Sequence, residues 1–289
     1  MLYRLIKPFL LSFRRDTARK FILWTLSHLG RIPFFRGAAS WFYGKDSKIL
    51  QRQVFDMQFK SPVGLASGFD RSGEACSELA AFGFSFITAG PVSTFADDGN
   101  KGVKNLIENI RHRSPDTILA AELVRSSHDS SENDIIRDYS ISFSLLYDFA
   151  DIFVVSAGGS DIDILSDILD ELLSLRLCYE SYKPILIRLA PEVDSVQLKD
   201  ILHYARMSGI DGIVADANDY VKTLELVKNI RSSTGGSLPI IAGGDICDEG
   251  RAAELLDAGA SLIQLGDELL DKGPGYVKRI LKKLIENSL

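Results

Sequence analysis

Eight short apolar runs, each followed by a helical pattern, constrain the fold of this 289-residue chain more than any other feature. The runs are mostly apolar without clean alternation, as expected of parallel strands buried on both faces. Eight strand–helix units are typical of a (β/α)8 barrel. We therefore predict an α/β fold of the TIM-barrel type, with strands at Val63–Ala66, Phe84–Ala89, Ile118–Leu123, Ile152–Val155, Ile185–Leu189, Gly212–Ala215, Ile240–Ala242 and Leu262–Leu265.

Three joins between a helix and the next strand share the same device, a glycine at the helix end. In LAAFGFSFITAG, ARMSGIDGIVAD and LLDAGASLIQLG, an apolar strand begins within three residues of Gly83, Gly209 and Gly259. Glycine accepts the left-handed conformation that closes a helix, so this repetition favours a closed barrel over an open sheet. Before the first barrel strand, the alternating segment Gln53–Phe59 predicts a two-stranded lid that plugs the amino end of the barrel.

The first 45 residues differ from the rest of the chain in charge and in aromatic content. They hold nine Lys or Arg residues against one acid, Asp16, although the whole chain has a net charge of −6. They also contain both tryptophans, Trp24 and Trp41, and six of the 16 phenylalanines. No run approaches the ~20 uncharged apolar residues of a spanning helix, and no small-residue cleavage site follows the first apolar run.

Two short amphipathic helices are predicted in this segment as an amino-terminal extension of the barrel. The first covers residues 1–13, and the second is expected to begin with Asp16 as its N-cap and to end at Gly30. We expect Phe21, Trp24, Leu26 and Leu29 on an apolar side and Arg19 and Lys20 on the polar side.

Basic helices that carry Trp and Phe suit the surface of a membrane, because apolar side chains enter the acyl boundary while the bases meet anionic lipid. The alternative is a helical cap packed on its own domain. We therefore divide the chain into a membrane-association segment, residues 1–45, and a barrel, residues 46–289. The predicted location is peripheral, on the cytoplasmic side of the membrane.

The cysteines and histidines provide no metal or disulfide pattern. Cys76, Cys178 and Cys247 are odd in number and widely spaced, which is typical of a reducing compartment. The four histidines have no metal-ligand spacing, so no metal site is predicted. The negative net charge argues against a nucleic-acid partner.

The carboxyl ends of the last two strands carry glycines where barrels commonly bind phosphate. Gly243-Gly244 fits such a site well and Gly266 fits in part, because backbone N–H groups there face an anion. The alternative is that these glycines only make tight turns. Three carboxylates follow the same strands and would repel a phosphate unless they point outward: Asp245, Asp267 and Glu268.

Arg188 lies inside the apolar strand ILIRLA, where an unpaired base would be costly. We expect its side chain to point into the barrel mouth. Its partner there is either an anionic ligand or a carboxylate such as Asp216, in which case the pair is structural.

Several segments resemble the dihydroorotate dehydrogenase family: SPVGLASGFDRSGE, KPILIRLAPEV, SGIDGIVA, DAGASLIQL and DKGPGYVKRI. The basic helical prefix is similar to the membrane-associated, quinone-reducing class 2 branch. The resemblance implies an FMN-containing barrel that oxidises dihydroorotate to orotate in pyrimidine synthesis, with quinone as the electron acceptor if the chain is active. The candidate cofactor-binding residues are Ser67, Gly68, Arg71, Ser93, Arg188, Gly243, Gly244, Gly266 and Asp267.

The chain departs from the family pattern at most of the positions that carry the chemistry. Where the family has N-x-S-S-P-N after the fourth strand, residues 156–161 read SAGGSD, so the serine base position is Gly159. The two family lysines are Arg71 and Arg188, and the Tyr-Ser pair near the flavin phosphate is Gly266-Asp267. Two segments that build the substrate wall, expected after residues 100 and 219, are missing.

These replacements predict a family scaffold that has lost its original chemistry. Glycine cannot accept a proton, and an aspartate at position 161 repels an anionic substrate that an asparagine would bind. The expected protein is therefore a catalytically degenerate relative with a protein partner of unknown identity. Two alternatives are an active dehydrogenase with a relocated serine base, Ser156 or Ser160, and a barrel repurposed to bind another small charged ligand.

Overall fold

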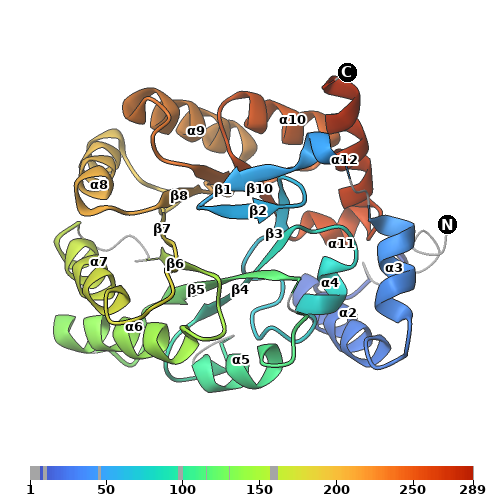
Figure 1. Cartoon of the computed structure of the whole chain (residues 1–289), viewed down its shortest axis with the longest axis horizontal. Coiled ribbons are helices and arrows are strands. Elements are labelled where there is room, and N and C mark those ends of the chain that lie inside the picture. Colours follow the sequence, from blue (N-terminus) through green and yellow to red (C-terminus); the bar gives the residue numbers. More distant parts are fainter. Residues whose placement is uncertain are drawn as a thin grey trace.

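Eight parallel strands close into a barrel surrounded by helices in the computed structural model of the chain (Figure 1). The structure describes residues 7–8, 12–44, 47–96, 100–114, 116–129, 131–156 and 162–288. The strand order around the barrel is β10-β3-β4-β5-β6-β7-β8-β9, so neighbours in the sequence are neighbours in the sheet. The predicted (β/α)8 fold is confirmed.

All eight predicted strands are present, and the clearest difference is that the second begins later and continues through Pro91. The barrel strands are β3 (Val63–Leu65), β4 (Phe86–Val92), β5 (Ile118–Val124), β6 (Ile152–Ser156), β7 (Ile185–Arg188), β8 (Gly212–Ala215), β9 (Ile240–Ala242) and β10 (Leu262–Leu265). The helices that follow them are α4 (Cys76–Ala80), α5 (Gly102–Ile110), α6 (Glu132–Leu146), α7 (Ile162–Arg176), α8 (Ser195–Ser208), α9 (Tyr220–Thr234), α10 (Glu249–Asp257), α11 (Glu268–Lys272) and α12 (Tyr276–Asn287).

The three predicted glycine closures have the expected backbone conformation. Gly83, Gly209 and Gly259 have φ angles of 101°, 80° and 117°. L-residues with a side chain rarely adopt these angles, so glycine is required at the points where the chain turns back toward the next strand.

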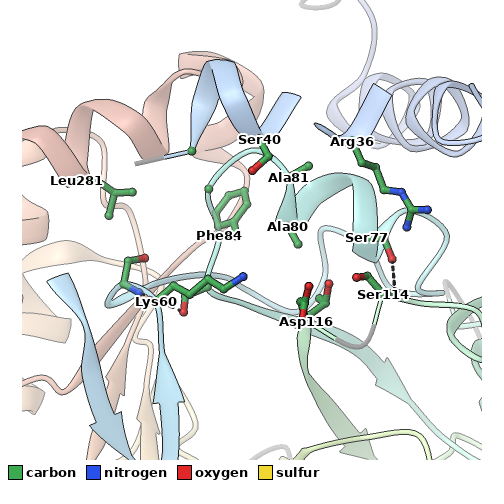
Figure 2. A pocket seen from close by; sticks show the side chains of 15 residues that line it. Arg36, Ser40, Lys60, Ser77, Ala80, Ala81, Phe84, Ser114, Asp116 and Leu281 are labelled. Atoms are coloured by element: carbon green, nitrogen blue, oxygen red, sulfur yellow. Dashed lines mark hydrogen bonds between the residues drawn. The ribbon is translucent and has the colours of Figure 1, made fainter. Parts of the chain in front are cut away.

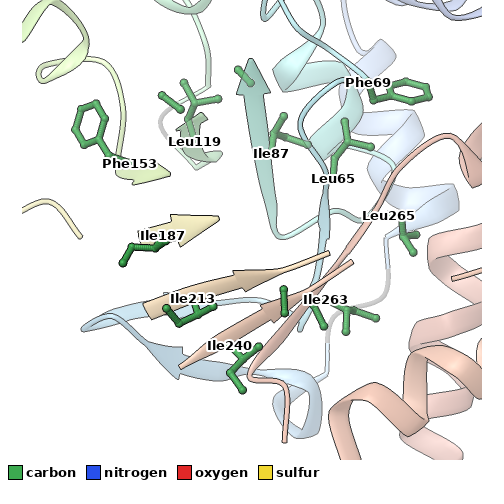
Figure 3. Packing of buried hydrophobic residues seen from close by; sticks show 14 of the residues in the cluster. Leu65, Phe69, Ile87, Leu119, Phe153, Ile187, Ile213, Ile240, Ile263 and Leu265 are labelled. Carbon is green, nitrogen blue, oxygen red and sulfur yellow. The ribbon is translucent and has the colours of Figure 1, made fainter. Parts of the chain in front are cut away.

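A hairpin closes the amino end of the barrel, as predicted. Strands β1 (Arg52–Val54) and β2 (Met57–Phe59) pair antiparallel, and Phe59 is fully buried. Phe59 contacts Phe86 edge to face, with ring centroids 5.7 Å apart, in a cluster with residues from the inside of the barrel. A second core lies between the strands and the surrounding helices and includes Leu65, Ile87 and Phe153 (Figure 3).

Two helices of the amino-terminal extension lie on one flank of the barrel, α2 (Arg15–Leu29) and α3 (Phe35–Tyr43) (Figure 1); the short 3-10 helix η1 (Lys48–Leu50) follows them. The first predicted helix, residues 1–13, lies largely outside the described residues. The prediction that Asp16 caps α2 is wrong, because the helix begins at Arg15 and Asp16 lies in its first turn. There its carboxylate still suits the positive end of the helix dipole.

Only part of the predicted apolar side of α2 packs against the barrel. Leu26 is buried, whereas the side chains of Phe21 and Trp24 are exposed. Arg19, predicted on the polar side, is instead largely covered, and its guanidinium Nη1 lies 3.5 Å from Asp267 Oδ1. Leu23 was not singled out from the sequence but is buried in the main core.

No helix in the described part of the chain has the length and the apolar character needed to cross a membrane.

Candidate site at the barrel mouth

A pocket of about 270 Å³ opens at the carboxyl ends of the strands. Residues that follow β3, β8, β9 and β10 line it, together with Arg188 at the end of β7 and Arg19 from α2. Six of the predicted cofactor-binding residues are among the lining residues: Ser67, Gly68, Arg188, Gly244, Gly266 and Asp267. The mouth is therefore the candidate site, as the barrel fold predicts.

Arg188 is held in the mouth by two carboxylates, one that follows the neighbouring strand β8 and one from β5, two strands away. Its Nη2 donates to Asp216 Oδ2 over 2.9 Å, and its Nη1 lies 3.5 Å from Glu122 Oε2. Ser67 Oγ donates a hydrogen bond to the same Glu122 carboxylate. Burial alone would lower the pKa of Arg188, but Glu122 and Asp216 raise it, so the guanidinium stays charged and paired.

The carboxylate partner that the sequence offered for Arg188, Asp216, is therefore in contact with it. Glu122 was missed by the sequence analysis. It lies in the middle of the apolar strand ILAAELV and is 4% exposed. A lone acid in one buried strand and a lone base in another are a signal of an ion pair, and that signal was present in the sequence.

Asp216 also covers the glycine pair that was predicted to bind phosphate. A Cβ at Gly243 would lie 2.7 Å from Asp216 Oδ2, and one at Gly244 would lie 2.8 Å from Oδ1. Gly244 has a φ of +87°, and Asn218 N–H donates to Asp216 Oδ1 over 3.2 Å. The two glycines thus make a tight turn that also leaves room for this carboxylate.

Glu268 points into the mouth and binds the backbone of the last two loops. Its Oε2 accepts the N–H of Gly266 over 2.7 Å, and its Oε1 accepts the N–H of Ile246 over 3.0 Å. Burial raises the pKa of the Glu268 carboxyl above its usual value, although these N–H groups oppose the shift. The outward orientation that would relieve repulsion of a phosphate is therefore wrong for Glu268.

The other two carboxylates near the predicted phosphate site are paired with arginines. Asp245 Oδ2 lies 2.7 Å from Nη1 of Arg251 in α10, and Asp267 contacts Arg19 of α2. The backbone N–H groups of Gly266 and Ile246 donate to Glu268 rather than to either of these two carboxylates.

Three predicted cofactor-binding residues are not among the residues that line the mouth pocket: Gly243, which directly precedes the lining residue Gly244, Ser93 and Arg71. Ser93 is fully buried in the loop after β4, where its Oγ donates to Phe95 O and accepts from Asn100 Nδ2 over 2.7 Å. Arg71 lies half-buried between β3 and α4. Its neighbour Asp70 accepts the N–H groups of Glu74 and Ala75 and so orders the loop that leads to α4.

Of the residues at or near the predicted base position, Ser156 lies within the described part of the chain and the others do not. Ser156 ends β6, half-buried, and pairs in the ladder with Val124 of β5 and Arg188 of β7. Gly159, Ser160 and Asp161 lie outside the described residues.

The residues at the mouth do not fit the phosphate of FMN. A phosphate on the last two loops needs the N–H groups of those loops, and Glu268 already accepts two of them. The Asp216 carboxylate lies against the glycine pair, so a phosphate there would also meet a second negative charge.

A second pocket, of about 350 Å³, lies at the opposite end of the barrel between α3, α4 and the residues that precede β3, β4 and β5 (Figure 2). Arg36 and Lys60 are exposed at its edge, and Ser77 Oγ accepts the N–H of Ser114 over 2.8 Å. Chemistry in (β/α)8 barrels is placed at the carboxyl ends of strands, so this pocket is not the candidate site.

The fold and the mouth define a (β/α)8 barrel protein with its candidate site at the carboxyl ends of the strands. The family model described as dihydroorotate dehydrogenase matches residues 49–102 and 220–287. Over these two stretches the chain is similar to the dihydroorotate dehydrogenase family.

Curated relatives match over almost the whole chain. The dihydroorotate dehydrogenase (quinone) of Christiangramia forsetii is 28% identical and that of Haemophilus ducreyi 25% identical, covering 99% and 98% of this chain and 99% of each relative. Each alignment runs over 342 positions, more than the 289 residues of this chain, so the relatives carry segments that it lacks. This agrees with the predicted loss of segments.

Solved structures show the same fold. The DHODH of Eimeria tenella in complex with ferulenol superposes with a TM-score of 0.82 over 94% of this chain and 91% of that chain, at 17% identity. A ligand-free form of the same protein gives a TM-score of 0.81 over 95% of both chains.

Proposed function

We propose that this chain is a dihydroorotate dehydrogenase homologue that does not carry out flavin-dependent oxidation. The observation that carries this proposal is the network of the mouth, in which Arg188 forms ion pairs with Glu122 and Asp216 and Ser67 donates to Glu122. Binding an anionic substrate at Arg188 would require breaking contacts with two carboxylates, and leaving either of them buried and unpaired is costly.

The serine that lines the mouth pocket among the described residues, Ser67, donates to Glu122, a carboxylate that already contacts Arg188. A serine needs an adjacent basic group to accept its proton. The described residues that line the pocket include no histidine, lysine or cysteine. The guanidinium of Arg188, which neighbours Ser156 in the ladder, is kept charged by its carboxylates and accepts no proton.

An absorption spectrum tests this proposal directly. The purified full-length chain is expected to be colourless, to retain no flavin through gel filtration after incubation with FMN, and to show no dihydroorotate-dependent reduction of quinone. A flavin spectrum that stays with the protein, together with turnover, would instead establish the alternative of an active enzyme with a relocated base at Ser156 or Ser160.

We further propose that residues 1–45 attach the protein to a membrane surface on its cytoplasmic side. Several large side chains of this segment project into solvent, including Phe34, Trp41 and Trp24, which are 90%, 83% and 56% exposed. Exposed aromatic side chains among many bases are typical of an interfacial anchor. The quinone-type names of the relatives support a membrane setting.

Replacing Phe34, Trp41 and Phe42 together by serine is expected to abolish sedimentation with anionic vesicles, because most of the apolar area that enters the lipid is removed. A matched control replaces three exposed apolar residues elsewhere, Leu177, Met207 and Val221. The control should bind vesicles as the wild type does. Equal binding by both variants would rule out α3 as the contact surface.

A further inference from the structure

The mouth contains a pair of backbone N–H groups held by a side chain from the same chain. The N–H groups of Gly266 and Ile246 come from the loops after β10 and β9, and both donate to the Glu268 carboxylate, over 2.7 and 3.0 Å. These loops are where (β/α)8 barrels commonly bind phosphate. A carboxylate presents two anionic oxygens to such donors, much as a phosphate does.

We propose that Glu268 is a built-in occupant of a phosphomonoester site, and that the site becomes functional when this carboxylate is removed. The inference concerns the same mouth as the proposed function but assigns a ligand chemistry to a specific pair of N–H groups. The carboxylate both uses the donors and places a negative charge where a phosphate would lie.

Three features favour a phosphate as the ligand of the opened site. The two N–H groups already converge on one anionic group, so they need no rearrangement to bind another. Gly266 has no side chain of its own to block the approach, since a Cβ there would meet only the Glu268 Oε2 atom, at 3.5 Å, and the Ala66 Cβ, at 3.9 Å. Arg19 lines the same pocket and places a guanidinium at its edge, where it contacts Asp16 and Asp267.

The test compares phosphate binding by the full-length chain and its Glu268→Ala variant. Alanine leaves the N–H groups of Gly266 and Ile246 without an acceptor, so the variant should have a lower Tm than the wild type. Inorganic phosphate should then raise the Tm of the variant in a saturable manner and leave that of the wild type unchanged. Calorimetry should show phosphate bound to the variant about tenfold or more tightly than to the wild type.

Asp245→Asn is the matched control, because it removes one negative charge from the same pocket without touching the two N–H groups. It should bind phosphate as weakly as the wild type. If it gains affinity as strongly as Glu268→Ala, the effect is one of general charge and the proposal is overturned.

A second variant covers the case in which Glu268→Ala does not fold. Glu268→Gln keeps one acceptor oxygen for one N–H group, and its phosphate affinity should lie above that of the wild type. Phosphate without effect on either variant overturns the proposal. In the opened site, FMN should compete with phosphate whereas riboflavin, which has no phosphate, should not; competition by both alike would also overturn it.

The two proposals can fail separately. Flavin retained by the wild type would refute the proposed loss of the dehydrogenase reaction. Phosphate binding by the Glu268 variants requires no flavin and decides only the role of Glu268.

Discussion

Replacing Arg188 by methionine is expected to lower the free energy of unfolding by about 3–5 kcal/mol, the cost of removing one partner from a buried ion pair. The guanidinium lies between Asp216 and Glu122, whose side chains are 9% and 5% exposed. Methionine fills much of the same space but leaves both carboxylates without their cation. Urea denaturation of the two proteins measures the difference.

Arg279→Met serves as the control, because Arg279 pairs with Glu249 at the surface, where its side chain is 50% exposed. An exposed pair of this kind contributes about 1 kcal/mol or less. Adding Asp216→Asn to Arg188→Met should recover part of the lost stability, since one buried negative charge is then removed. Equal losses for Arg188→Met and Arg279→Met would show that the mouth network contributes nothing to the fold.

The stability of the protein is expected to fall as the pH rises from about 4 to about 6 because of Asp70. This side chain is fully buried, and its oxygens accept the N–H groups of Glu74 and Ala75 over 2.8 and 2.9 Å. Burial raises the pKa of Asp70 from 3.8 to about 6, and these N–H groups only partly oppose the shift. The folded chain therefore holds a proton that the unfolded chain has already released.

The sign follows from that difference in bound protons. Stability contributed by protonated Asp70 is fully present below pH 3.8 and is lost as the pH rises through about 6, by about 3 kcal/mol in total. Unfolding measured across this range should show the decline in the wild type and a clearly smaller one in Asp70→Asn, which has no proton to lose. Parallel pH profiles for the two proteins would exclude Asp70 as the source.

The barrel was predictable because its strands carry their signal locally, in short apolar runs and in the glycines that end the helices. The packing of α2 was not, because a basic helix with apolar residues on several sides has more than one face that can be buried. The structure buries Leu23 and Leu26 and exposes Trp24. The choice depends on the acidic partners Asp267 and Asp271, which lie about 250 residues later.

The contacts of the mouth were likewise predictable from the sequence only in part. Arg188 and Asp216 could be paired from sequence, because both are costly charges at the ends of adjacent buried strands. The direction of Glu268 could not, because a glutamate after a strand reaches either solvent or the backbone depending on its rotamers. The family model leaves residues 103–219 unmatched, and this stretch contains the three charged residues of the ion-pair network, Glu122, Arg188 and Asp216.

The hairpin that closes the amino end of the barrel limits the direction from which a molecule can reach the mouth. Phe59 packs against Phe86, and apolar side chains fill the interior of the barrel behind them, so the amino end is closed. A molecule that reaches the carboxylates of the mouth therefore enters and leaves on the carboxyl side of the barrel. Two ligands therefore compete for this opening. The Glu268 carboxylate, which already binds two backbone N–H groups there, competes with each of them.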